Sequence, residues 1–306
     1  MSSPRELLEE YRVERALHVA PSTLRGEFHY TERFLSFLGS QGVHQVGEIS
    51  FEVLNSYREF LQTKLGCRGK PLSPCYQYKS VAYPRKFLIW AFRRGHTLVD
   101  FELYSLPVQE RPDILPPTVE QVRKLLAVPD TGKPTGLRNL GILESFYSLA
   151  LRRHESHRLN IDDLDFRRRL IRISGKPRRE RLLPLSDRLC ELLQRYLEEA
   201  RPALRPLPSE EALWVSSSTG KRLGEVPLRL TVTTLSERIG LGKIYPHLLR
   251  HACATHLHEA GAELSHIRDF LGHSSIASTE RYVHVTPTEL GRFVREFHPR
   301  QSEGSA

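Results

Sequence analysis

The stretch from His247 to Tyr282 carries four polar side chains that could do chemistry together. His247 and Arg250 are three residues apart, His273 follows 23 residues after Arg250, and Tyr282 lies nine residues beyond His273. Arginine holds a phosphate with two hydrogen bonds and keeps its charge, imidazoles donate hydrogen bonds or move protons, and a tyrosine hydroxyl can act as a nucleophile. This set of side chains suits phosphoryl transfer.

Two helices are expected to bring these side chains to one pocket. Apolar residues follow His247 and Arg250 at helical spacing, Gly261 is expected to end that helix, and a second helix is expected to begin near Glu263. A helix, a turn and a helix could therefore face one site.

The bulk composition indicates a folded, basic protein. A chain of 306 residues has room for about two domains, and 39% hydrophobic residues are ample for folded cores. The 45 Lys and Arg residues exceed the 36 Asp and Glu residues, which gives a net charge of +9. Such a charge favours a polyanionic partner. Nucleic acid is the first candidate, and an anionic membrane surface is the competing one.

Neither a membrane segment nor a metal site is indicated. The chain has no run of 18 apolar residues and its N-terminus lacks the apolar core of a signal peptide, so we expect a cytoplasmic, nucleoid-associated protein. His247 and His251 could form a metal pair, but the glutamate of an HExxH motif is absent. The four cysteines show no CxxC spacing, so we expect reduced thiols and no metal or other cofactor: Cys67, Cys75, Cys190 and Cys253.

The first 105 residues are expected to form a small helical domain. Amphipathic helices are predicted from Pro4 to about Leu17 and then from starts at Ser22, Ser50 and Ser73. Pro84 lies inside the last of these and should kink or split it. Four cations on this helix are candidate DNA contacts, with a solvated face as the alternative: Arg85, Lys86, Arg93 and Arg94.

Residues 106 to 117 form a predicted linker, and residues 118 to 306 form a second domain. Four prolines end the helical periodicity in the linker. Thr118 should then cap a helix through Leu126. A buried helix over residues 137 to 151 is expected to deliver Arg152 and Arg153 at its end.

The apolar periodicity changes to alternation after residue 165, which predicts a β-hairpin. Strands are expected over residues 170 to 174 and 181 to 185, with Lys176 near the turn. Seven arginines lie in or next to this hairpin: Arg167, Arg168, Arg169, Arg172, Arg178, Arg179 and Arg181. So many like charges favour an anionic partner over a plain solvated face.

These residues together resemble the tyrosine recombinases, or phage integrase family. The pattern comprises His247-x-x-Arg250, Leu271-Gly272-His273 and Tyr282, with an arginine at a helix end and a hairpin lysine upstream. The resemblance implies a mostly α protein with a small β-hairpin or sheet, in which a SAM-like core-binding domain and an α+β catalytic domain form a C-shaped clamp. It further implies site-specific DNA recombination by a Xer-like or mobile-element enzyme.

The resemblance assigns roles to the upstream residues of the site. Arg152 and Arg250 resemble the two arginines that clamp the scissile phosphate and stabilise the charge of its transition state. Lys176 resembles the lysine that protonates the departing 5′ oxygen. Glu155, three residues after Arg152, resembles an acidic residue that steadies the site.

The resemblance also assigns roles to the downstream residues. His247 and His273 would hydrogen-bond the phosphate, and His247 is the better candidate to accept the tyrosine proton. Tyr282 would attack and form a 3′-phosphotyrosine. A free tyrosine has a pKa of about 10, so the site must assist its deprotonation.

One departure from the family pattern concerns the first arginine. A hydrophobic residue usually follows it, whereas Arg152 is followed here by Arg153 and His154. The 24-residue interval to Lys176 and the three-residue step to Glu155 favour Arg152. Arg153 stays the rival.

The resemblance implies assembly on DNA. A helix over residues 288 to 297 carries an apolar stripe (Leu290, Phe293, Val294, Phe297) that could pack within its own chain. In the family this helix docks into a neighbouring protomer of a synaptic tetramer, which is the favoured interpretation. Accessory DNA-bending proteins are further candidate partners. A type IB-like DNA topoisomerase and a catalytically inactive DNA-binding relative are the alternatives. The predicted DNA contacts are Arg85, Lys86, Arg93, Arg94, Arg168, Arg169, Arg178, Arg179 and Arg181.

Overall fold

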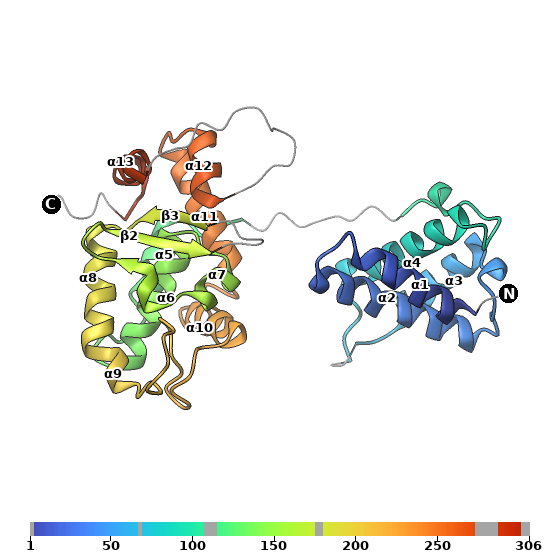
Figure 1. Cartoon of the computed structure of the whole chain (residues 1–306), viewed down its shortest axis with the longest axis horizontal. Coiled ribbons are helices and arrows are strands. Elements are labelled where there is room, and N and C mark those ends of the chain that lie inside the picture. Colours follow the sequence, from blue (N-terminus) through green and yellow to red (C-terminus); the bar gives the residue numbers. More distant parts are fainter. Residues whose placement is uncertain (1–2, 67–68, 107–114, 175–179, 273–286, 301–306) are drawn as a thin grey trace. The chain divides into compact units, whose positions relative to one another are not determined.

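The chain divides into two compact units, residues 1–113 and 114–306, and the division falls inside the predicted linker. A computed structural model gives the arrangement of each unit (Figure 1). No helix in the described part of the chain is long and apolar enough to cross a membrane. The structure describes residues 3–66, 69–106, 115–174, 180–272 and 287–300.

The first unit is helical, as predicted. Helix α4 packs against α1, α2 and α3, and it packs most extensively against α2. Ser73 caps α4 as expected, because its side chain accepts a hydrogen bond from the Tyr76 backbone N–H. The helices are α1 (Pro4–Ala16), α2 (Pro21–Ser40), α3 (Phe51–Thr63) and α4 (Pro74–Arg93), with the 3-10 turns η1 (Val46–Glu48) and η2 (Phe101–Leu103).

Two details of the first unit differ from the sequence prediction. Helix α2 begins at Pro21 after the cap residue Ala20, which lies two residues before the predicted cap Ser22. Helix α4 continues through Pro84 as one helix, so the split that was one of the two predicted outcomes does not occur. A proline in a helix costs about 3 kcal/mol. Fully buried Phe87 and Leu88 on the same helix contribute about 1.5–3 kcal/mol each, which offsets that cost.

The second unit is mostly helical with one small antiparallel sheet of strand order β1-β2-β3, which confirms the predicted fold class. Strand β1 was not predicted. The elements are α5 (Val119–Leu126), α6 (Pro134–Ser148), α7 (Arg153–Arg158), η3 (Ile161–Asp163), β1 (Leu164–Asp165), β2 (Leu170–Ser174), β3 (Glu180–Pro184), α8 (Asp187–Arg195), the π-helical turn η4 (Tyr196–Ala200), α9 (Arg201–Ala203), α10 (Glu225–Arg238), α11 (Pro246–Glu259), α12 (Leu264–Leu271) and α13 (Pro287–Phe297).

Helix α6 lies at the centre of the second unit. It packs against α5, α7, α8, α10 and α11, and 11 of its 15 residues are buried. A helix that is buried on every side is typical of a domain core. Gly141 permits the close approach of Trp214, since a Cβ atom there would lie 2.8 Å from the Trp214 ring. Trp214 is itself fixed by a 3.2 Å hydrogen bond from its indole nitrogen to Ser156 on α7.

The predicted hairpin is confirmed as β2 and β3. Their register pairs Leu170 with Pro184 and Ser174 with Glu180, and the turn between them, with Lys176, lies outside the described residues. Alternate residues Ile171 and Ile173 point into the core, as strand alternation requires. Helix α7 packs against β2, and α13 packs against β3.

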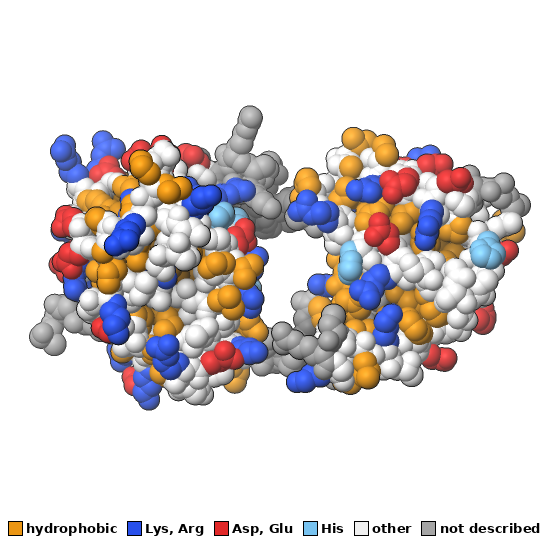
Figure 2. All heavy atoms as spheres, turned by 90° about the horizontal axis from the view of Figure 1, so that it is seen from below, with side chains coloured by type: hydrophobic (Ala, Val, Ile, Leu, Met, Phe, Trp, Pro, Cys, Tyr) orange, Lys and Arg blue, Asp and Glu red, His pale blue; other side chains and the backbone are white. Residues whose placement is uncertain are grey.

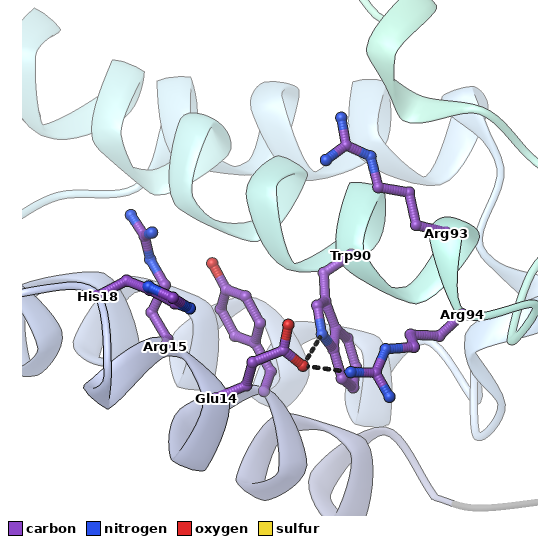
Figure 3. Close-up of a pocket in the computed structure, with 7 residues that line it drawn as sticks. Glu14, Arg15, His18, Trp90, Arg93 and Arg94 are labelled. Atoms are coloured by element: carbon purple, nitrogen blue, oxygen red, sulfur yellow. Dashed lines mark hydrogen bonds and ion pairs between the residues drawn. The ribbon is translucent and has the colours of Figure 1, made fainter.

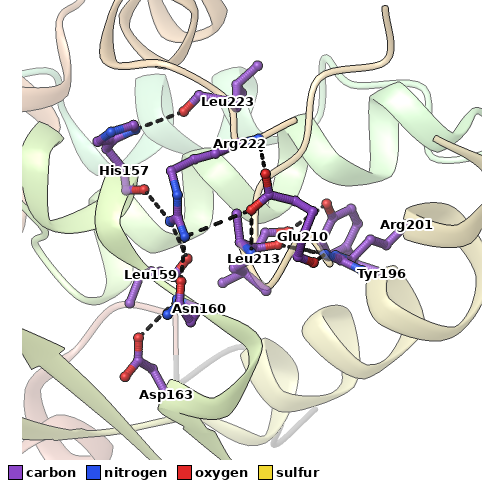
Figure 4. Close-up of polar contacts among 11 residues, drawn as sticks. His157, Leu159, Asn160, Asp163, Tyr196, Arg201, Glu210, Leu213, Arg222 and Leu223 are labelled. Carbon is purple, nitrogen blue, oxygen red and sulfur yellow. Dashed lines mark hydrogen bonds and ion pairs between the residues drawn. The ribbon is translucent and has the colours of Figure 1, made fainter. Parts of the chain in front are cut away.

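A polar cluster fixes the far end of α7 (Figure 4). Arg222 donates hydrogen bonds to the carbonyls of His157 and Leu159, at 2.9 and 3.1 Å, and to the Asn160 side chain at 2.6 Å. Glu210 in turn accepts the Arg222 backbone N–H at 2.8 Å. Buried carbonyls at the end of α7 thus find donors on the connection before α10. The helix that begins beside Arg152 is therefore held at both ends.

Candidate active site

The connection between α6 and α7 presents Arg152. The predicted helix over residues 137 to 151 ends earlier than expected, at Ser148. Ala150 then adopts a left-handed conformation with φ of 48°. Arg152 is not the end of a helix but the N-terminal cap of α7. The tight turn at Ala150 exposes a backbone carbonyl that a second arginine binds.

Glu155 explains why α7 begins directly after Arg152. Its carboxylate accepts the Arg152 backbone N–H at 2.8 Å and the Arg152 Nη1 at 2.9 Å. This reciprocal arrangement satisfies donors at the helix start that would otherwise lack partners. The Glu155 side chain is fully buried, while the Arg152 side chain is 34% exposed. Arg152 is thus anchored on one side and reaches solvent on the other.

A second arginine, Arg181 on β3, binds the same carboxylate. Its Nη1 and Nη2 donate to the two oxygens of Glu155 at 2.9 and 3.0 Å. Burial alone would raise the pKa of Glu155, but the hydrogen bonds and charge of Arg181, followed by the hydrogen bonds of Arg152, lower that pKa to about 2. Glu155 is therefore ionised throughout the physiological pH range.

Arg250 on α11 reaches the same backbone carbonyl as Arg152. It is buried, and its Nη1 and Nη2 donate to the carbonyls of Ala150 and Leu271 at 2.5 and 2.7 Å. The Nη1 of Arg152 lies 3.5 Å from the same Leu271 oxygen, and its Nη2 lies 3.3 Å from the Gly272 oxygen. Two guanidinium groups therefore converge on the C-terminal end of α12, where carbonyls carry partial negative charge.

The electrostatics of this cluster are those of an anion site. Burial, then the charge of Arg152, lower the pKa of Arg250 to about 10, so Arg250 stays protonated near pH 7. Glu155 neutralises only one of the three guanidinium charges of Arg152, Arg181 and Arg250. The excess positive charge in a partly buried site favours an anionic ligand.

His247 lies at the start of α11, three residues before Arg250. Its side chain lies at the surface but is partly desolvated by its neighbours, and this desolvation, followed by the charges of Arg250, His251 and Arg152, lowers its pKa below the usual 6.5. A histidine with a lowered pKa is neutral at pH 7 and has a lone pair that can accept a proton.

Gly272 ends α12 in the left-handed conformation, with φ of 64°. A Cβ atom at this position would lie 3.2 Å from the Arg181 guanidinium, so only glycine fits without strain. His273 follows immediately, but His273, Tyr282 and Lys176 lie outside the described residues. Gly272, which precedes His273, and Arg181, five residues after Lys176, both lie at the arginine cluster.

Arg153, the rival of Arg152, lies in a different environment. Its Nε donates to the Glu225 carboxylate on α10 at 2.8 Å, and its side chain is 45% exposed. No contact of Arg153 with Arg250, Glu155 or the end of α12 occurs among the hydrogen bonds and ion pairs of the described residues. The geometry favours Arg152 as the partner of Arg250.

Comparison with known proteins identifies the family. The model of the phage integrase family matches residues 118–289. The chain belongs to the phage integrase family.

Relatives in this family are tyrosine recombinases. XerC of Pelotomaculum thermopropionicum is 39% identical over 186 residues, which cover 59% of this chain and 60% of that protein, less than two thirds of its length. XerD of Staphylococcus epidermidis is 33% identical over 71% of this chain and 74% of its own length. XerC 2 of Ralstonia nicotianae is 33% identical over 90% of this chain and 80% of that protein.

Solved integrase structures share the fold. The Tn1549 transposon integrase in complex with transposon right end DNA gives a TM-score of 0.69 at 19% identity, over 96% of this chain and 99% of that one. A lambda integrase dimer bound to a COC′ core site gives a TM-score of 0.66 at 12% identity, over 90% and 93%. At these identities the likeness establishes the fold alone.

In the first unit of this integrase-family chain, the cations predicted to bind DNA form hydrogen bonds or ion pairs with other residues of the same unit. Arg94 donates to Glu14 at 2.7 Å beside Trp90, as Figure 3 shows. Arg93 pairs with the exposed Glu102. The others are Arg85, which donates to the Glu102 carbonyl at 2.7 Å, and Lys86, which lies 3.1 Å from the buried Glu27.

The predicted cations of the sheet divide into three groups. Arg168 and Arg169 are exposed and pair with the carboxylates of Asp165 and Asp187. Arg178 and Arg179 lie outside the described residues. Arg181 faces Glu155 instead of solvent, with 17% of its side chain exposed. On the face shown in Figure 2, Lys and Arg side chains lie among Asp and Glu on both units.

The sequence missed the backbone part of this site. Arg152 and Arg250 donate hydrogen bonds to the backbone carbonyls of Ala150, Leu271 and Gly272. A pattern of side chains does not indicate which backbone carbonyls take part in a site. Gly272, directly before His273, is the one feature of the sequence that indicates this backbone arrangement. No group of three or more His, Cys, Asp or Glu side chains in the described ranges is placed to hold a metal ion.

Proposed function

We propose that this protein is a site-specific DNA recombinase that cleaves and rejoins duplex DNA through a covalent 3′-phosphotyrosine at Tyr282. One observation carries the proposal. Arg152 and Arg250, 98 positions apart in the sequence, meet at the end of α12, where the chain enters the stretch from His273 to Tyr282. Family membership and the tyrosine recombinase relatives support it.

In the proposed reaction the two arginines bind the non-bridging oxygens of the scissile phosphate. Arg152 and Arg250 now also donate to backbone carbonyls at the end of α12, and a phosphate oxygen is the stronger acceptor because it carries a full negative charge and can bind a guanidinium through two parallel hydrogen bonds. The fixed positive charge would stabilise the charge that grows on the phosphate during attack. Arg152, and not Arg153, is assigned this role because only Arg152 shares the site with Arg250.

The proton transfers are assigned to neighbouring groups. The Tyr282 oxygen attacks phosphorus, and His247, neutral at pH 7, accepts the tyrosine proton. The 5′ oxygen leaves with a proton from Lys176, and His273 hydrogen-bonds the phosphate. The phosphodiester becomes a phosphotyrosine ester, and attack by a 5′ hydroxyl reverses the step. The bond energy stays in the adduct, so the cycle needs no nucleotide cofactor.

Cations on both units are the proposed DNA contacts outside the site. Arg93, Arg94, Arg168 and Arg169 pair with exposed or half-exposed carboxylates, and such surface pairs contribute only about 0–1 kcal/mol. Phosphates can therefore replace those carboxylates at little cost. Lys86 differs, because it also neutralises the buried Glu27. Arg85, Arg178 and Arg179 complete the proposed set of DNA contacts.

Assembly into a tetramer on DNA, with or without DNA-bending partners, is the remaining part of the proposal. Within this chain the apolar stripe of α13 is buried, with Leu290, Phe293 and Val294 packed near β3 and α12. Exchange of α13 between protomers would require this face to leave its own unit and to dock on the same surface of a neighbour.

A nicked suicide substrate tests the proposed chemistry. The DNA should be a cloned recombination site recovered by sequencing DNA that is covalently trapped by the protein. The wild type should form a covalent protein–DNA species that Tyr282→Phe does not form. Tyr245→Phe is the matched control, because Tyr245 is an exposed tyrosine next to Pro246 and His247 and should leave the adduct unchanged. Tight binding without an adduct would indicate an inactive relative, and relaxation of supercoils without a specific site would indicate a topoisomerase.

A further inference from the structure

Arg181 has both ends of its guanidinium committed to one buried carboxylate. Nη1 and Nη2 bind the two oxygens of Glu155 at 2.9 and 3.0 Å, and 17% of the side chain is exposed. The remaining nitrogen, Nε, is buried and has no acceptor among the described residues. An arginine that grips a phosphate uses this same two-nitrogen fork. Arg181 therefore cannot serve as a bidentate DNA contact while it holds Glu155.

Glu155 is shared evenly between two arginines. Each carboxylate oxygen accepts two hydrogen bonds, one from Arg152 and one from Arg181. With Arg181 in place the carboxylate is neutralised from the β3 side, so the charge of Arg152 stays available to a ligand. Without Arg181, Arg152 would be the sole direct counterion of a buried carboxylate and would be held toward it.

Arg181 also joins three segments that carry the proposed reaction. It lies on β3, five residues after Lys176, and it binds α7 through Glu155. Its guanidinium carbon and Nη1 lie about 3.2–3.3 Å from the position of a Cβ on Gly272, so it packs against the residue before His273. One side chain thus sets the hairpin, the Arg152 turn and the end of α12 relative to each other.

We propose that Arg181 is a positioning residue for DNA cleavage, which acts through Glu155 on Arg152 and is not a DNA contact. The inference rests on the proposed function. It replaces the role that the sequence pattern suggests for Arg181 with a different one for the same reaction.

The first test separates binding from cleavage. For Arg181→Met we expect a DNA dissociation constant within about threefold of the wild type. The single-turnover rate of adduct formation at saturating protein should fall about 100-fold, because small displacements of a catalytic group have costs of this order. Arg181→Lys should recover part of the rate, since it restores the charge but not the fork.

A DNA contact would behave in the opposite way. Arg181→Met would then weaken binding and reduce the slope of log K against log salt by about 0.9, the value for one phosphate contact. The cleavage rate at saturation would be unchanged. That result would overturn the inference. Arg172→Met is the matched control, because Arg172 is an exposed arginine on the neighbouring strand β2 that pairs with Asp163; its cleavage rate should match the wild type.

A double-mutant cycle tests the route through Glu155. If Arg181 acts through this carboxylate, Arg181→Met should slow cleavage less than threefold in a Glu155→Gln background. If the reductions in cleavage rate of the two single variants multiply in the double variant, the coupling through Glu155 is contradicted. Thermal melts and far-UV circular dichroism would check that each variant is folded. Where Arg181→Met does not fold, Arg181→Gln, which can still donate one hydrogen bond to Glu155, takes its place in both tests.

Failure of the inference is distinguishable from failure of the proposed function. If the wild-type protein traps no DNA covalently, the proposed function is refuted. A wild type that forms the adduct, with an Arg181→Met variant that cleaves at the same rate, removes only the positioning role.

Discussion

The choice between Arg152 and Arg153 is the sharpest prediction of the site geometry. The perturbations are Arg152→Ala and Arg153→Ala, which remove adjacent side chains of identical chemistry. Arg152 shares the end of α12 with Arg250, while Arg153 pairs with Glu225 on the surface. Only the first should affect the chemical step.

The two expected magnitudes differ by about two orders. Loss of one preorganised donor to a transition-state oxyanion costs about 2.7–4 kcal/mol, so Arg152→Ala should slow cleavage about 10²–10³-fold. The Arg153 Nε lies 2.8 Å from a Glu225 carboxylate oxygen, and the two side chains are 45% and 37% exposed. Such an exposed pair contributes at most about 1 kcal/mol to stability. Arg153→Ala should therefore leave the cleavage rate within about threefold and lower the melting temperature slightly.

The assay is the single-turnover rate of covalent adduct formation at saturating protein, with binding measured separately by gel shift. Arg152→Lys serves as a control that keeps the charge and loses the fork; it should cleave faster than Arg152→Ala and slower than the wild type. A large loss with Arg153→Ala and near-normal cleavage with Arg152→Ala would refute the assignment of the site.

Three further predictions follow from the same residues. Gly272→Ala should lower the melting temperature and slow cleavage, because a left-handed conformation costs an L-residue about 1–2 kcal/mol and the new methyl would press on Arg181; unchanged values would contradict this packing. The cleavage rate should fall at acid pH with a midpoint below 6.5, because protonated His247 cannot accept the tyrosine proton; a pH–rate profile whose acid limb persists in His247→Ala would assign that limb to another group. His298 is buried, and its burial lowers the pKa from 6.5 to about 4, so the unfolded chain binds a proton that the folded chain does not bind between these values. The free energy of unfolding should therefore decrease by about 2–3 kcal/mol between pH 7 and 4.5 through this group, and urea denaturation should show a smaller decrease for His298→Gln.

Much of the fold was predictable because local signals and packing agree. Ser73 and Thr118 cap the helices that the sequence assigned to them, and the alternation after residue 170 gave the hairpin. Gly261 and Glu263 mark the boundary between α11 and α12 as expected. In each case the residue that ends or starts the element acts through its immediate neighbours.

The parts that were not predictable depend on contacts between distant residues. The apolar run Leu149 to Leu151 continues a helical pattern, yet Ala150 leaves the helix and gives its carbonyl to Arg250, 100 positions away. Helix α4 tolerates Pro84 because of the core around it. Arg181 lies among the other arginines of the hairpin and was therefore predicted to be a surface cation. Its partner, Glu155, lies 26 positions away in the sequence, on α7. Sequence periodicity contains no information on such pairs.

The most direct measurement of the central claim is the identity of the protein–DNA bond. The trapped adduct should be digested with protease and nuclease, and the modified peptide should be sequenced by mass spectrometry. We predict a nucleotide joined through its 3′ phosphate to Tyr282, with a free 5′ hydroxyl on the other DNA end. Attachment to another residue, or through a 5′ phosphate, would contradict the account.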